Sequence, residues 1–165
     1  MLSISCLNGN RAAKPGVEHF GHRVAMLRRA LLPHPQFDLL ELVDVNFSVL
    51  QTLPQLKKQF SGTQLVFLFG SDIIDGLPDW PNAERLLASS ELLIGLRKHN
   101  EQPAVELAIR AWPTQPQSLT IIASYAPEVS SGRIRAALYR RQTAGGLLAS
   151  VQRYSDRHWL YVSLA

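Results

Sequence analysis

The stretch Gln64-Leu-Val-Phe-Leu-Phe69, followed directly by Gly70-Ser71-Asp72, decides the fold of this chain. It is a short, nearly continuous apolar run, which is typical of a strand in a parallel sheet that is covered on both faces. Two similar runs follow along the chain, Leu92-Leu-Ile-Gly-Leu96 and Leu119-Thr-Ile-Ile-Ala-Ser124. The three runs therefore predict a parallel sheet.

Segments with helical periodicity alternate with these runs. Between Arg23 and Leu32, the apolar residues Val24, Leu27 and Leu31 recur at helical spacing. Comparable patterns predict helices over residues 48–60, 81–89, 132–142 and after Gly145-Gly146, and strands over residues 2–7 and 37–43. This alternation predicts a Rossmann-like α/β fold, with a parallel sheet of about five strands and helices on both faces. We expect one domain over residues 1–165, with the proline-containing stretch 98–117 as a variable excursion near the substrate side.

Composition limits the classes of function. The chain has 165 residues, 46% of them hydrophobic and 18% charged, which excludes a disordered chain or a coiled coil. No run approaches the ~20 apolar residues that span a bilayer. The single cysteine, Cys6, excludes an internal disulfide and a zinc site built from paired cysteines. The net charge of +4 is spread over short basic groups, which fit solvated helix faces or an anion pocket better than a nucleic-acid surface. We expect a soluble cytoplasmic protein with neither nucleic acid nor membrane as partner.

Two candidate ligand contacts follow the first of the three runs, because ligands bind beyond the carboxyl ends of parallel strands. Gly70 lets a ligand approach the backbone, and Asp72 can accept hydrogen bonds from a ribose or a ring amine. The alternative is a tight turn that Asp72 caps. Trp80 lies between Pro78 and Pro81, so its ring either stacks on a planar ligand or fills a gap in the core.

A third candidate is the segment Val129-Ser-Ser-Gly-Arg-Ile-Arg135, which precedes a predicted helix. Either serine can cap the helix and leave backbone N–H groups pointing outward at its positive end. With Arg133 and Arg135 added, the segment suits a chain of phosphates. The alternative is a capped helix whose arginines lie in solvent.

Taken in order, these segments resemble the nicotinate/nicotinamide mononucleotide adenylyltransferase family, from about Lys14 onward. The matching segments are His22-Arg-Val-Ala-Met-Leu27, Asn46-Phe-Ser-Val-Leu-Gln-Thr-Leu53, Phe67-Leu-Phe-Gly-Ser-Asp72, Leu77-Pro-Asp-Trp80, Ser130-Ser-Gly-Arg-Ile-Arg135 and the ending from Val151 to Tyr161.

The resemblance implies adenylyl transfer, in which the phosphate of nicotinate or nicotinamide mononucleotide attacks the α-phosphorus of ATP, with Mg²⁺ accompanying the ATP. ATP and a pyridine mononucleotide would be the partners, and a homo-oligomer is compatible with the family. The implied ATP-binding residues are Gly70, Asp72, Ser130, Ser131 and Arg135, and the implied mononucleotide-binding residues are Ser48, Thr52, Trp80 and Arg97. Gly132 stands where the family often has threonine.

The chain departs from the family at its catalytic signature, a first strand followed by the turn G-x-F-x-P-x-H-x-G-H. Only His19-Phe-Gly-His22 matches, at the last four positions. In one alternative, residues 2–7 are the first strand, and His19 and His22 are the catalytic histidines. In the other, residues 2–7 are the family's second strand and the match is chance. The chain would then be a shortened gene model or a homologue that has lost catalysis.

Overall fold

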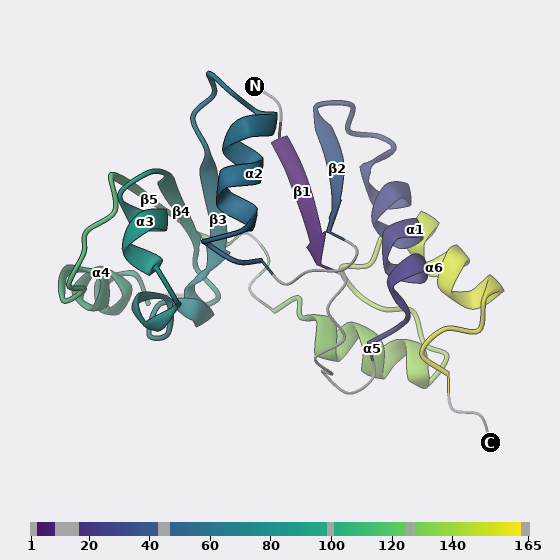
Figure 1. Ribbon diagram of the computed structural model, residues 1–165. Helices are drawn as coiled ribbons and strands as arrows, with labels where there is room; N and C mark the ends of the chain where they lie inside the picture. Colours follow the sequence, from purple (N-terminus) through teal and green to yellow (C-terminus); the bar gives the residue numbers. More distant parts are fainter. Residues whose placement is uncertain are drawn as a thin grey trace. The chain divides into compact units, whose positions relative to one another are not determined.

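The computed structural model describes residues 3–8, 17–42, 47–98, 101–124, 126 and 128–162 (Figure 1). The chain divides into two compact units. Unit 1 consists of Met1–Asn46 and Glu128–Ala165, and unit 2 of Phe47–Pro127. Each unit contains a parallel sheet and is described by itself. That residues 1–165 form a single domain stays a prediction.

Unit 1 contains a two-stranded parallel sheet and three helices. Strand β1 (Ser3–Asn8) pairs with β2 (Phe37–Leu42), and the helix α1 (Phe20–Leu31) connects them. A parallel pair needs such a crossover, since its strands run in the same direction. Helices α5 (Ser131–Tyr139) and α6 (Ala149–Arg157) follow from the second part of the chain, and α6 lies against α1 (Figure 1).

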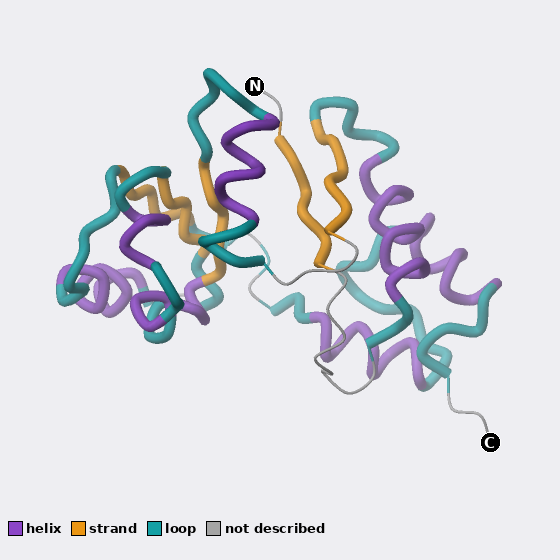
Figure 2. The backbone as a smooth tube through the Cα atoms, in the orientation of Figure 1, coloured by secondary structure: helices purple, strands orange, loops and turns teal. Residues whose placement is uncertain are grey.

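Unit 2 contains a three-stranded parallel sheet in the order β3-β4-β5 (Figure 2). Its strands are β3 (Val66–Gly70), β4 (Glu91–Gly95) and β5 (Ser118–Ile122), and its helices are α2 (Thr52–Gln59), α3 (Ala83–Leu87) and α4 (Gln102–Arg110). Two short 3₁₀ turns, η1 (Ser71–Ile73) and η2 (Leu77–Asp79), follow β3. The carboxyl ends of β3 and β4 meet at Gly70 and Gly95, which are paired in the ladder.

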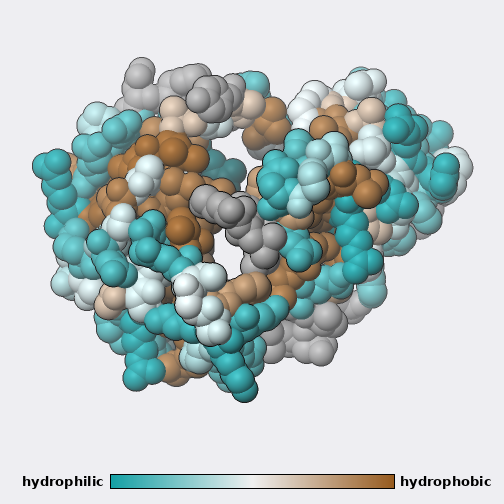
Figure 3. All heavy atoms as spheres, turned by 90° about the horizontal axis from the view of Figure 1, so that it is seen from above, coloured by the Kyte–Doolittle hydropathy of each residue, from teal (hydrophilic) through white to brown (hydrophobic). Residues whose placement is uncertain are grey.

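One face of this sheet packs against the helices. Leu92 and Ile94 of β4 are buried together with Leu53 of α2, Leu86 of α3 and Ile109 of α4. The alternation of side chains along a strand sends the neighbouring residues to the other face. That face exposes large apolar side chains, namely Val66 (44%), Leu68 (63%) and Ile122 (41%). Apolar atoms accordingly reach the surface of unit 2, on the left of Figure 3.

The five predicted strands are all present and parallel, but two parts of the predicted architecture need correction. The strands pair as two sheets, β1-β2 and β3-β4-β5, because among the described residues β1 pairs only with β2 and β3 only with β4. In addition, the described helices of unit 2 cover one face of its sheet, so a nearly continuous apolar run does not mean here that both faces are covered.

The stretch 98–117, predicted to be a variable excursion, contains helix α4 (Gln102–Arg110). Pro103 lies in the first turn of α4, where a helix does not use the backbone N–H group that proline lacks. Pro54 likewise lies in the first turn of α2. The helix begins at Thr52 and continues past Pro54 to Gln59. Within the described residues, no helix is long and apolar enough to cross a membrane.

Candidate functional site

Gly70, Asp72 and Arg97 meet at the carboxyl ends of β3 and β4. Arg97 Nε donates a hydrogen bond of 3.1 Å to Asp72 Oδ1, and both side chains are 60% exposed. A Cβ atom on Gly70 would lie 2.5 Å from Arg97 Nε and closer still to Asp72 Oδ1. The backbone of Gly70 has an ordinary φ of −79°, so space rather than conformation calls for glycine at this position. The structure thus brings three predicted site residues into contact.

Trp80 packs on the core of unit 2, as one of the two predicted alternatives has it. Its ring meets Phe69 in a T-shaped contact at 5.8 Å between centroids and Phe47 at 6.4 Å. These contacts join Trp80 to the core of unit 2, yet its side chain is only partly buried. Trp80 is therefore held by the core and still presents part of its surface.

Ser48 and Thr52 organise the start of α2. The Ser48 backbone N–H donates to Thr52 Oγ1 at 3.0 Å, and the Thr52 N–H donates to the Ser48 carbonyl at 2.7 Å. Thr52 is buried at 2% exposure, whereas Ser48 is partly accessible. Of these two predicted mononucleotide contacts, Ser48 is the accessible one, and Thr52 holds the Ser48 backbone in place.

In unit 1, Ser130 caps α5 as the sequence predicts. Its Oγ accepts a hydrogen bond of 3.2 Å from the Arg133 backbone N–H, and Ser131 begins the helix with an exposed side chain. A surface pocket of about 380 Å³ lies beside this cap, lined by residues 128–130 and by one side of α5. Gly146 closes it with a φ of 80°, and a Cβ there would lie 2.6 Å from the Val129 side chain. Only glycine fits that close approach.

Arg135, one turn further along α5, lies in a charged cluster with the C-terminal Tyr161. Burial raises the pKa of Tyr161, and the Glu18 carboxylate raises it further. The positive charges of Arg135 and Arg23 oppose this rise in the pKa. The Tyr161 backbone N–H also donates to Glu18 Oε1 at 2.9 Å, which ties the C-terminal segment to the start of α1.

His19 and His22 have partners within unit 1. His19 caps α1, where its Nδ1 accepts a long hydrogen bond of 3.4 Å from the Gly21 backbone N–H. Nδ1 of His22 lies 3.0 Å from the Tyr154 hydroxyl on α6. The His158 ring packs 5.5 Å from that of His22. Among the described residues, no group of three or more His, Cys, Asp or Glu side chains is placed to hold a metal ion.

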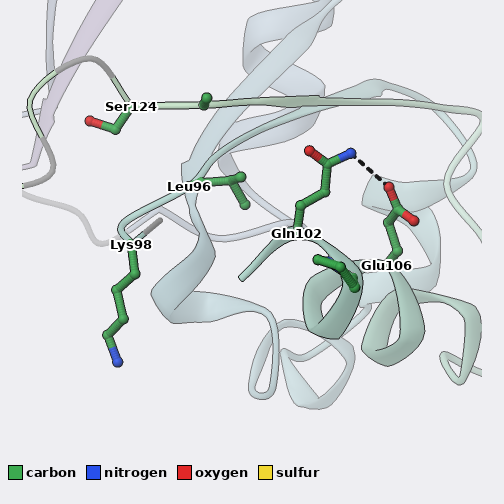
Figure 4. Close-up of a pocket in the computed structure, with 7 residues that line it drawn as sticks. Leu96, Lys98, Gln102, Glu106 and Ser124 are labelled. Atoms are coloured by element: carbon green, nitrogen blue, oxygen red, sulfur yellow. Dashed lines mark hydrogen bonds between the residues drawn. The ribbon is translucent and has the colours of Figure 1, made fainter. Parts of the chain in front are cut away.

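Sequence reasoning missed a pocket of about 490 Å³ at the carboxyl ends of β4 and β5 (Figure 4). Its lining includes Lys98, Ser124, and Gln102 and Glu106 of α4, and the last two are joined by a hydrogen bond of 2.8 Å (Figure 4). The sequence signal was the amphipathic pattern of α4, which contains one proline, Pro103. Of the other segments quoted from the sequence, Lys14 and Asn46 lie outside the described residues.

No protein-family model matches the chain, but curated proteins do. The chain is 31% identical over 147 residues to a probable nicotinate-nucleotide adenylyltransferase of Buchnera aphidicola subsp. Acyrthosiphon pisum, an alignment that covers 78% of this chain and 67% of the relative. It is 28% identical over 149 residues to a probable nicotinate-nucleotide adenylyltransferase of Thermomicrobium roseum, and this alignment covers 85% of this chain and 67% of the relative. The nicotinate-nucleotide adenylyltransferase of Bacillus subtilis is 35% identical over 89 residues, and this alignment covers 50% of this chain and 46% of the relative. The chain thus spans about half to two thirds of the length of these relatives.

Solved structures show the same fold. The nicotinic acid mononucleotide adenylyltransferase of Plasmodium falciparum complexed with NaAD superposes with a TM-score of 0.73 at 17% identity, covering 96% of this chain and 81% of that one. The same enzyme complexed with APC gives a TM-score of 0.71 at 16% identity, with the same coverage. At this identity the likeness establishes a Rossmann-like α/β fold.

Proposed function

The chain belongs to the nicotinate-nucleotide adenylyltransferase family, a family of nucleotidyltransferases of NAD biosynthesis, and from this we propose that it joins nicotinate or nicotinamide mononucleotide to the adenylyl group of ATP. A phosphate oxygen of the mononucleotide attacks the α-phosphorus of ATP, the bond from that phosphorus to the bridging oxygen breaks, and pyrophosphate leaves with the electron pair. The step needs no protein nucleophile. The chain holds the phosphates in line and balances their charge.

The observation that carries this proposal is the exposed Asp72–Arg97 pair above Gly70. A ligand that reaches the ends of β3 and β4 meets an exposed carboxylate and an exposed guanidinium, which lie directly over Gly70. The carboxylate suits the hydroxyls of a ribose or a ring amine, and the guanidinium suits an anionic group of the mononucleotide. Trp80, which is only partly buried, is proposed as the aromatic surface for a pyridine ring.

The proposed ATP-phosphate contacts are Ser130, Ser131 and Arg135 of unit 1. A helix N-terminus attracts anions through its free N–H groups and its dipole, and the exposed start of α5 offers both. Arg135 adds a guanidinium on the same helix. The solved structural neighbours support nucleotide ligands for this fold, since one is complexed with NaAD and the other with APC.

We propose that Mg²⁺ arrives with ATP rather than in a site built by the chain. The described residues provide no group of His, Cys, Asp and Glu suited to a metal ion. Mg²⁺ is commonly bound through substrate phosphates, where it neutralises their negative charge. No contact between this chain and the metal ion is therefore part of the proposal.

A nucleotide-binding homologue without catalysis is the second candidate. The contacts of the two histidines favour it, because His19 Nδ1 caps α1 and His22 Nδ1 is paired with Tyr154. If the histidines serve α1 in this way, the chain binds its nucleotides and does not turn them over.

Two measurements on the same preparation separate the candidates. Pyrophosphate release is followed with ATP, Mg²⁺ and each mononucleotide, and calorimetry follows the binding of each ligand alone. Release that requires both substrates supports the transferase. Binding without release supports the second candidate, and the absence of both contradicts the two proposals together.

A further inference from the structure

We propose that Glu101 is a positioning residue that fixes the main chain of Arg97, so that the Arg97 guanidinium is presented to an anionic group of the mononucleotide. The ligand assigned to Arg97 rests on the function proposed above. Glu101 directly precedes α4, in the stretch that the sequence predicts to be a variable excursion.

A single oxygen of Glu101 joins the ends of two strands. Glu101 Oε1 accepts hydrogen bonds from the Ser71 hydroxyl at 2.6 Å, from the Lys98 backbone N–H at 3.0 Å, and from the Arg97 backbone N–H. Ser71 follows β3, whereas Arg97 and Lys98 follow β4. The carboxylate therefore holds the η1 turn and the turn after β4 in one arrangement.

The Ser71 hydroxyl completes the network. It donates to Glu101 and accepts a hydrogen bond of 3.0 Å from the Arg97 N–H. The Arg97 N–H is thus shared between a hydroxyl and a carboxylate oxygen. This double attachment fixes the backbone at the residue whose side chain is proposed to bind the ligand.

The charge of Glu101 is suited to this role. Partial burial by itself raises the pKa of the carboxyl, but the hydrogen bonds from Ser71 and from two backbone N–H groups outweigh it, together with the nearby Lys98 charge. The net pKa lies below its ordinary value, so Glu101 is ionised at neutral pH. Hydrogen bonds to an ionised acceptor are the stronger kind.

Arg97 is therefore fixed at its backbone, while its side chain remains largely exposed. The side chain is 60% exposed and donates a hydrogen bond from Nε to Asp72. A guanidinium carries five N–H donors in a planar fork, so further donors remain for a phosphate or carboxylate of the ligand. An anchored backbone lowers the conformational cost of placing such a long side chain.

The test compares Glu101→Ala and Glu101→Gln with Glu84→Ala, a control that removes an exposed carboxylate from α3 in the same unit. Steady-state kinetics give KM for the mononucleotide, KM for ATP, and kcat. Hydrogen exchange reports the protection of the Arg97 and Lys98 amides. Glu101→Ala is expected to raise KM for the mononucleotide about tenfold or more, with KM for ATP within about twofold and both amides exchanging faster. For Glu101→Gln, the mononucleotide KM and the amide exchange rates are expected to lie between those of the wild type and of Glu101→Ala. The glutamine amide oxygen accepts the same hydrogen bonds but carries no charge.

Two results would overturn the proposal. One is a Glu101→Ala protein that matches the Glu84→Ala control in mononucleotide KM and in amide exchange. The other is an equal rise in both KM values together with a lowered Tm, which would show a merely structural role. A wild-type chain that binds no mononucleotide would instead contradict the proposed function, and the exchange rates would still decide whether Glu101 holds the turn.

Discussion

Replacing Gly70 by alanine is expected to change the stability of the chain little and to weaken mononucleotide binding strongly. The added Cβ would lie 2.5 Å from Arg97 Nε and 2.8 Å from Arg97 Nη2, and closer still to Asp72. These atoms are the ends of flexible, exposed side chains, so they move away and the backbone keeps its place. Their ion pair contributes about 0.2–1 kcal/mol, as exposed pairs do. Alanine at an unstrained φ adds about 0.4–1 kcal/mol to the free energy of unfolding, because it lowers the conformational entropy of the unfolded chain.

The free energy of unfolding is therefore expected to change by less than about 1 kcal/mol, which shifts Tm by no more than about 4 °C for a chain of this size. Binding is expected to suffer more. Displacement of Arg97 removes a charge-assisted hydrogen bond of about 1.5–3 kcal/mol to the mononucleotide, which is about ten- to hundredfold in KM. Thermal melting and steady-state kinetics check both numbers. Gly76→Ala is the control, since its Cβ would meet no atom closer than Ile73 O at 4.0 Å. An unchanged KM, or a fall in Tm above about 10 °C, would refute this reasoning.

Three further predictions concern Trp80 of unit 2 and Arg135 and Tyr161 of unit 1. Trp80→Ala is expected to raise KM for the mononucleotide more than KM for ATP and to cost about 1–3 kcal/mol of stability, because the ring packs on Phe69 and Phe47; equal effects on both KM values would contradict the pyridine-stacking role. Arg135→Ala is expected to raise KM for ATP about ten- to hundredfold with Tm nearly unchanged, and a large fall in Tm would identify a structural arginine instead. The raised pKa of Tyr161 means that the folded chain keeps this proton when the unfolded chain loses it. The contribution of Tyr161 to the free energy of unfolding is therefore constant below pH of about 10 and decreases as the pH rises above it. Tyr161→Phe should weaken that fall in a series of Tm measurements, and an unchanged slope would exclude Tyr161 as its source.

Much of the fold could be predicted because strands and helices of this kind are encoded locally. The apolar runs at β3, β4 and β5 are continuous, and each observed strand overlaps its predicted segment. Pairing is not local. The apolar run at β3 does not reveal that, among the described residues, β3 pairs with β4 alone. It also does not reveal that the face of the sheet that carries Leu68 is exposed. Helix α4 was not predicted, because it lies in the proline-containing stretch 98–117, which was interpreted as a variable excursion.

The candidate site likewise contains residues that the sequence predicts and contacts that it does not. Residues with a local signal were found, such as Gly70 after its strand and Ser130 before its helix. The contact between Asp72 and Arg97 requires the register of two strands, and Glu101 reaches back to Ser71, thirty positions away. A bond across that separation leaves no periodic trace in the sequence.

The formation of a dinucleotide tests the central claim most directly. Purified chain is incubated with ATP, Mg²⁺ and nicotinate or nicotinamide mononucleotide, and the products are separated chromatographically. We expect dinucleotide and pyrophosphate in equal amounts, and neither when one substrate is withheld. Calorimetric binding of both nucleotides with no dinucleotide from either mononucleotide would contradict adenylyl transfer by this chain.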